Sequence, residues 1–175
     1  CMGYEIAGGL GVKMADESRE VYVMVGDGSY LMMSSEIVTS VQEGYKLTIV
    51  LINNHGYASI GGLSKSLGSE GFGTQYRYRK EESGQLDGTP LPVDLAANAE
   101  SLGAIVLKAT DEASFNQALI EARQNTRTTV IYIETPPERK MAGYGHAWWE
   151  VPVSQVSETE GIRDAYNRLK ENKKL

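Results

Sequence analysis

The chain has 175 residues, of which 41% are hydrophobic, and this length suits one compact domain with a short appended tail. Its formal net charge of −6 argues against an electrostatic partner such as a nucleic acid or an anionic membrane. No apolar run approaches the roughly 20 residues of a membrane-spanning helix, and the single cysteine, Cys1, excludes an internal disulfide framework. We therefore expect a cytoplasmic protein that binds neither nucleic acid nor membrane.

The first residues predict a fragment of a longer polypeptide. Cys1 stands where an initiator methionine would stand, and a glycine-rich helix over residues 3–14 follows without a strand before it. Because glycine and small apolar residues recur there at helical spacing, we expect this helix to pack close to neighbouring backbone.

Two β-branched runs over residues 21–25 and 47–52 predict strands, and the segment 30–43 between them has the length of one helix. The helix would be about 21 Å long and a six-residue strand about 20 Å long, so the helix can carry the chain back along the sheet by about the length of one strand. The three segments therefore predict a right-handed crossover between parallel strands. Asp27 and Asn54 would then lie at the same carboxyl edge of the sheet, where open α/β sheets bind ligands.

Helices and strands continue to alternate after residue 57. The predicted elements are a weak helix over 57–67, a helix over 93–102, a strand over 104–107, a helix over 112–124 capped by Thr110 or Asp111, a strand over 129–134 and a surface helix over 157–170 that starts with a capping box of Ser157 and Glu160. Alternation of this kind indicates an α/β fold, in which a mostly parallel, doubly wound sheet lies between two layers of helices. Residues 68–92 have no sustained period and predict a long loop, as is typical of functional or mobile segments.

A Pro-Pro pair ends the predicted main domain, which covers residues 1–137, and residues 138–175 form the tail. Within the tail, Trp148 and Trp149 favour a buried anchor over a cover for an active site. His146 has no identified partner, so we interpret it as structural.

Polar residues follow both strands of the crossover. Gly26-Asp27-Gly28-Ser29 follows the first strand, and Asn53-Asn54-His55-Gly56 follows the second. A Gly-Asp-Gly sequence alone is more often a turn, but a carboxylate, an amide and a backbone carbonyl together are hard oxygen donors that suit Mg²⁺. The helix that opens at Ser29 would present free N–H groups to a phosphate at the same place. No zinc-like spacing and no lysine-bearing phosphate loop compete with this metal and diphosphate site.

This pair of segments resembles the thiamine-diphosphate signature of the pyruvate decarboxylase and acetolactate synthase superfamily. The resemblance implies that Mg²⁺ is bound by side-chain oxygens of Asp27 and Asn54 and by the main-chain carbonyl of Gly56. The implied cofactor-binding residues are Gly26, Asp27, Gly28, Ser29, Asn54, Gly56 and Tyr57, with Gly28 and Ser29 on the diphosphate and Tyr57 beside the cofactor.

The resemblance also implies what the chain lacks. Enzymes of this superfamily activate the cofactor with a glutamate from a separate pyrimidine-binding domain, usually contributed by another subunit. We therefore expect a homo-oligomer that acts on a small-molecule substrate, with its catalytic glutamate outside this chain. The chain alone would hold the diphosphate end of the cofactor and would be inactive.

The tail over residues 144–153 and the start of the chain resemble those members that hydrolyse a carbon–carbon bond of a cyclic 1,2-dione in inositol catabolism. A domain of an acetolactate synthase, a glyoxylate carboligase or a 2-oxoacid decarboxylase remains an alternative. Outside the superfamily, a non-catalytic regulatory module that binds Mg²⁺ and phosphate, or a domain that serves only for interaction, also remains open.

Overall fold

The computed structural model describes residues 1–136 and 152–173, which fall into two compact units. The first unit contains residues 1–56 and 92–136, and the second contains residues 57–91 with the described part of the C-terminal segment. His146, Trp148 and Trp149 lie outside the described residues. The predicted domain boundary near residue 137 stays a prediction.

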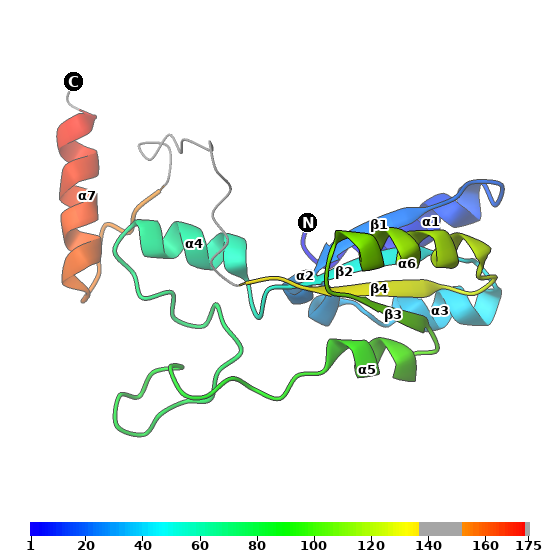
Figure 1. The fold of residues 1–175 in the computed structure, drawn as a ribbon. Coiled ribbons are helices and arrows are strands. Elements are labelled where there is room, and N and C mark those ends of the chain that lie inside the picture. The colour runs from blue at the N-terminus through cyan, green and yellow to red at the C-terminus, as the bar shows by residue number, and fades with distance from the viewer. Residues whose placement is uncertain (137–151, 174–175) are drawn as a thin grey trace. The chain divides into compact units, whose positions relative to one another are not determined.

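The first unit is built on a sheet of four parallel strands in the order β1-β2-β4-β3 (Figure 1). The strands are β1 (Tyr22–Gly26), β2 (Thr48–Asn53), β3 (Ile105–Ala109) and β4 (Thr129–Glu134). Gly26 of β1 pairs with Ile52 of β2, and Ile52 pairs with Ile133 of β4. Since all strands run the same way, their carboxyl ends meet at one edge, as predicted.

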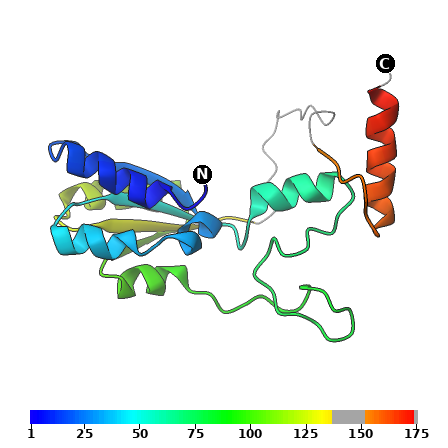
Figure 2. The same ribbon diagram turned by 180° about the vertical axis from the view of Figure 1, so that it is seen from behind.

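Helices cover both faces of this sheet, which confirms the predicted α/β fold (Figures 1 and 2). The helices of the first unit are α1 (Glu5–Ala15), α2 (Asp27–Met32), α3 (Glu36–Glu43), α5 (Leu95–Ser101) and α6 (Glu112–Gln124). Residues of α1, α3 and α5 share one core with Val23, Ile49 and Val130. Helix α6 packs on the opposite face, where Ala118 and Ala122 share a core with Ile131.

The prediction of one helix over residues 30–43 was wrong. Helix α2 already begins at Asp27 and ends at Met32, and α3 begins only at Glu36. Met33 between them leaves the helical conformation, with φ −155° and ψ 62°, and the Ile37 N–H donates to the Ser34 carbonyl. We attribute the break to the adjacent serines 34 and 35, because serine side chains compete with the helical hydrogen bonds of the backbone.

The predicted caps of two other helices have different outcomes. Asp111, one of the two predicted caps, does cap α6, and it forms a capping box with Ser114. The capping box predicted for Ser157 and Glu160 was wrong, because the Ser157 hydroxyl accepts from the Thr159 N–H and α7 (Glu160–Asn172) begins three residues later. Serine therefore forms a local turn here instead of capping the helix.

The second unit contains α4 (Ala58–Ser66), the loop that follows it, and α7. The loop has no helix or strand, as predicted, and contains only isolated bridge positions, such as the pair Arg77 and Pro90. In α7, Ala165 and Leu169 are the buried apolar residues. No helix in the described part of the chain is long and apolar enough to cross a membrane.

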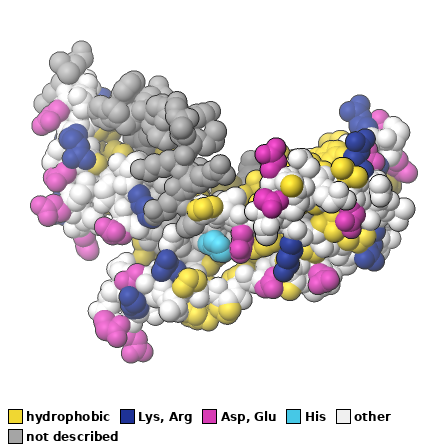
Figure 3. Space-filling model, in the orientation of Figure 1, with side chains coloured by type: hydrophobic (Ala, Val, Ile, Leu, Met, Phe, Trp, Pro, Cys, Tyr) yellow, Lys and Arg dark blue, Asp and Glu magenta, His cyan; other side chains and the backbone are white. Residues whose placement is uncertain are grey.

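Charged side chains of both signs are interspersed on the face of the molecule that Figure 3 shows. Among the described residues on that face, neither sign forms a large continuous area.

The close packing of α1 on β1 yields a paired test. A Cβ added at Gly9 would lie 2.3 Å from Cγ2 of Val23, whereas a Cβ added at Gly11 would meet no atom within 4 Å. We expect Gly9→Ala to lower the free energy of unfolding by about 1–3 kcal/mol, because the valine is stiff and the interface is filled. The matched Gly11→Ala should raise it by up to about 1 kcal/mol through helix propensity. Equal shifts in thermal unfolding for both variants would contradict this packing.

Candidate functional site

The candidate site lies at the carboxyl edge of β1 and β2. Asp27 directly follows β1 and starts α2, and it is only 1% exposed. Asn53 ends β2, and Asn54, His55 and Gly56 continue the chain at the same edge. The strand register therefore brings together the two polar segments that the sequence separates.

A direct hydrogen bond joins the two segments. The Gly56 N–H donates to Oδ2 of Asp27 over 2.7 Å. One terminal atom of the Asn54 carboxamide lies 3.2 Å from Oδ1 of Asp27 and 2.8 Å from the Gly56 carbonyl oxygen. The structure thus groups the three residues that the sequence predicts as metal ligands, and their role as ligands stays a prediction.

The Asn54 carboxamide can take two orientations that differ by a half turn. With its nitrogen near Asp27 and Gly56, the amide donates to both of their oxygens. With its oxygen in that position, three oxygen atoms face one another, which is favourable only when a cation lies between them. Bonds of about 2.1 Å to Mg²⁺ put neighbouring octahedral ligands about 3 Å apart, and the two distances of 2.8 and 3.2 Å bracket that value. The donor set therefore fits Mg²⁺.

The carboxyl of Asp27 is poorly stabilised in its ionised form by the protein alone. Burial raises its pKa above the ordinary value, and backbone hydrogen bonds from Gly56, Gly28 and Asn54 oppose the rise only in part. A cation bound to this oxygen would favour the carboxylate and offset the cost of burial.

Helix α2 fixes the residues that are predicted to hold a diphosphate. Gly26 precedes the helix in extended conformation, and Gly28 and Ser29 are buried in its first turn. An added Cβ at Gly26 would meet no atom within 4 Å, so packing does not require glycine there, and the space is open to a ligand.

The fully buried Tyr30 holds helix α2 in place, because its hydroxyl donates to Oδ1 of Asn98 over 2.8 Å. Burial raises the pKa of this tyrosine to about 12, so its hydroxyl keeps its proton.

Comparison with known families decides what kind of site this is. A family model described as "Thiamine pyrophosphate enzyme, C-terminal TPP binding domain" matches residues 1–133. The chain belongs to this family. The match confirms the resemblance found in the sequence, and it makes the chain a domain that binds thiamine pyrophosphate (TPP), also called thiamine diphosphate.

Two curated relatives carry the name 3D-(3,5/4)-trihydroxycyclohexane-1,2-dione hydrolase. The protein of Bacillus thuringiensis (strain Al Hakam) is 43% identical over 166 residues, which are 95% of this chain and 26% of that protein. The protein of Geobacillus thermodenitrificans (strain NG80-2) is 44% identical over 175 residues, which are 100% of this chain and 27% of that protein. The TPP-binding domain is therefore homologous to one part of these hydrolases and spans about a quarter of their length.

Solved structures of other TPP enzymes share the fold. Benzoylformate decarboxylase from Polynucleobacter necessarius superposes with a TM-score of 0.63 and 24% identity over 79% of this chain and 24% of its own. A thiamine diphosphate-dependent 4-hydroxybenzoylformate decarboxylase of Rhodococcus jostii RHA1 gives a TM-score of 0.57 and 23% identity over 77% of this chain and 23% of its own. At these identities the likeness concerns the fold alone.

One predicted cofactor contact falls outside the first unit. Tyr57 precedes α4 in the second unit, where its ring meets the ring of Tyr76 edge-on at 6.0 Å. Its N–H donates to the Thr74 carbonyl over 2.8 Å. The predicted place of Tyr57 beside the cofactor therefore stays a prediction.

Sequence reasoning missed several residues that contact the site segments. Asn98 holds Tyr30, and Tyr132 and Glu134 at the end of β4 connect to Asn53. A signal was present for the last two, because polar side chains alternate with isoleucines in a strand that would otherwise be buried.

The buried carboxylate generates a stability prediction. The pKa of the Asp27 carboxyl is higher in the folded state than in the unfolded state. The free energy of unfolding therefore falls as the pH rises from the ordinary aspartate pKa through the folded-state pKa, because the ionised carboxylate is buried. Asp27→Asn removes this loss, so without divalent cations we expect it to raise the free energy of unfolding at pH 7 by about 1 kcal/mol. The gain should shrink toward pH 3. The control is Asp87→Asn, which changes an exposed carboxyl. Both variants are compared with the wild type by thermal unfolding, and a lower stability of Asp27→Asn at pH 7 would contradict the prediction.

Proposed function

We propose that this domain binds the diphosphate end of TPP through Mg²⁺. The observation that carries the proposal is the convergence of an Asn54 carboxamide atom on Oδ1 of Asp27 and the carbonyl oxygen of Gly56, at distances suited to an octahedral cation. Membership of the TPP-binding family supplies the identity of the cofactor.

The residues take separate roles in this proposal. Asp27 and Asn54 give side-chain oxygens to Mg²⁺, and Gly56 gives its carbonyl oxygen. Gly28 and Ser29 in the first turn of α2 face the diphosphate, whose remaining charge suits their N–H groups. Gly26 leaves space for the ligand, and Tyr57 lies beside the cofactor. Bound TPP supplies a carbon nucleophile for carbonyl substrates.

We further propose that the polypeptide encoded by the gene hydrolyses a carbon–carbon bond of a cyclic 1,2-dione in inositol catabolism. Support comes from the 43% and 44% identity to dione hydrolases over nearly the whole of this chain. In this proposal the activating glutamate lies on a pyrimidine-binding domain, contributed by another subunit of a cytoplasmic homo-oligomer. This chain alone would be inactive because half of the cofactor site is elsewhere.

Calorimetry on the encoded polypeptide tests the choice of cofactor. TPP with Mg²⁺ should bind, and ADP with Mg²⁺ should bind much more weakly, because the proposed site recognises a thiamine cofactor rather than any diphosphate. Preferential binding of ADP would support a regulatory phosphate-binding module instead. Assays against trihydroxycyclohexane-1,2-dione and pyruvate then test the substrate, and activity on pyruvate alone would reject dione hydrolysis.

The metal ligands are tested by substitution in the same polypeptide. We expect Asp27→Ala to lower Mg²⁺-dependent TPP binding and dione hydrolysis by more than roughly 100-fold, because a charged ligand of the metal is lost. Asp87→Ala removes an exposed carboxylate of the second unit and should leave both near normal. Near-normal activity of Asp27→Ala would favour a domain that serves only for interaction.

A further inference from the structure

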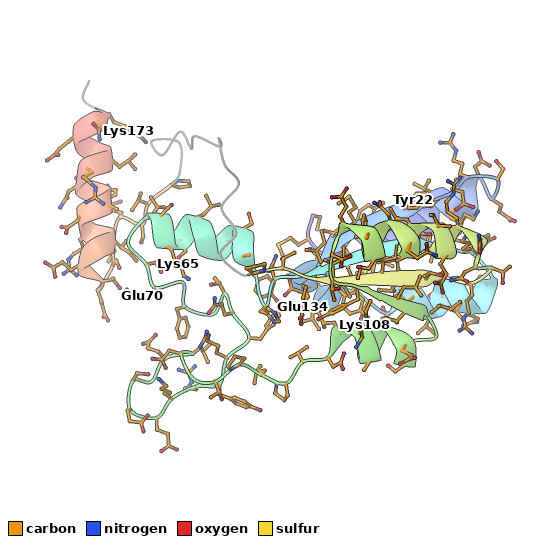
Figure 4. The ribbon with its side chains drawn as sticks, in the orientation of Figure 1. Tyr22, Lys65, Glu70, Lys108, Glu134 and Lys173 are labelled. Atoms are coloured by element: carbon orange, nitrogen blue, oxygen red, sulfur yellow. The ribbon has the colours of Figure 1, made fainter. Side chains whose placement is uncertain are left out.

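A hydrogen-bonded chain of side chains runs from β2 to the end of β4. Nδ2 of Asn53 donates to the Tyr132 hydroxyl oxygen over 2.7 Å, and that hydroxyl donates to Oε1 of Glu134 over 2.9 Å. Figure 4 shows Glu134 at the carboxyl end of β4. The three side chains therefore lie at the same edge of the sheet as Asp27.

Asn53 connects this chain to the loop that follows β2. Its Oδ1 accepts from the His55 N–H over 3.0 Å, and its own carbonyl accepts from the Thr135 N–H over 2.9 Å. Asn53 is 3% exposed, so water does not replace these partners readily. Because Tyr132 holds the nitrogen of the carboxamide, the oxygen stays directed at His55.

The loop needs this support at His55. This residue has a φ of +64°, and it is the only non-glycine residue with positive φ in the described ranges 1–136 and 152–173. Such backbone is strained for a residue with a Cβ and persists only when its surroundings hold it. The turn at His55 directs the next N–H, that of Gly56, onto Oδ2 of Asp27. The hydrogen bond from His55 to Asn53 thus fixes the conformation that brings the metal-binding atoms together.

We propose that Tyr132 and Glu134 are positioning residues for the metal site. They orient Asn53, Asn53 holds the strained turn at His55, and the turn places Asn54 and Gly56 against Asp27. The inference rests on the proposed function of this edge as the Mg²⁺ and TPP site. It assigns a role to the end of β4, which supplies none of the proposed ligands.

The role of Glu134 is to accept a hydrogen bond and does not depend on its charge. Its side chain is 61% exposed, and its ion pair with Nε2 of His55, at 3.8 Å, is also exposed on the histidine side. Exposed pairs of this kind contribute little. The bond from the Tyr132 hydroxyl is shorter, at 2.9 Å, and leads into the buried Asn53.

The main test uses Tyr132→Phe in the polypeptide that the gene encodes. Mn²⁺ replaces Mg²⁺ as the probe, because its electron paramagnetic resonance spectrum reports both occupancy and the symmetry of the ligands. With TPP present, we expect Tyr132→Phe to weaken Mn²⁺ binding roughly tenfold and to alter the spectrum of the bound ion. Tyr22→Phe is the control, because it removes a tyrosine hydroxyl at the opposite end of the sheet (Figure 4). It should change neither the Mn²⁺ affinity nor the spectrum of the bound ion.

Substitutions of Glu134 separate positioning from charge. Glu134→Gln keeps an acceptor oxygen for the Tyr132 hydroxyl and should retain Mn²⁺ affinity within about twofold, whereas Glu134→Leu should lose roughly tenfold. Equal loss in both variants would show that charge matters, and it would overturn the inference. This pair of variants also decides the question if Tyr132→Phe fails to fold.

The outcomes separate this inference from the proposed function. If the wild-type polypeptide does not bind Mn²⁺ with TPP, the proposed function fails. If the wild type binds and Tyr132→Phe binds equally well with the same spectrum, the proposed function stands and the positioning role of Tyr132 and Glu134 is rejected. If Tyr132→Phe binds Mn²⁺ more weakly while Tyr22→Phe binds it as the wild type does, the result supports both the proposed function and the positioning role.

Discussion

The burial of the Asp27 carboxylate is the constraint on which the site depends. A carboxylate that is 1% exposed costs free energy unless donors or a cation surround it. The Gly56 N–H supplies one donor, and the start of α2 supplies others. This compensation is incomplete, as the raised pKa indicates. The fold therefore maintains, at the expense of its own stability, a group that would favour the proposed metal.

Much of this arrangement could be predicted from the sequence because it depends on local patterns. The two β-branched runs predict β1 and β2, and parallel pairing then puts Asp27 and Asn54 at one edge. The break between α2 and α3 could not be predicted from periodicity, since Tyr30, Met33 and Ile37 keep helical spacing across the two serines that interrupt the helix. The bond between Asn53 and Tyr132 joins positions 79 apart, and no local pattern encodes such a contact.

The two faces of the sheet are covered unequally in the first unit. Helices α1, α2, α3 and α5 contribute to one core on one face, whereas α6 packs on the other, over β3 and β4. Tyr22 and Met24 of β1 alternate with the buried Val23 and are 45% and 69% exposed. The site thus lies beside a strand that is well packed through α1 on one side only, and the close contact of Gly9 with Val23 stabilises that side.

The two orientations of the Asn54 carboxamide have a consequence for how the site is loaded. With its nitrogen turned inward, the amide links Asp27 and Gly56 and takes the place of a cation. In the proposed metal site, exchange of this amide for Mg²⁺ would require a rotation about one side-chain bond, while the backbone of the loop keeps its shape. Such a site would be ready before its ligand arrives, so little of the binding free energy would be spent on ordering the chain.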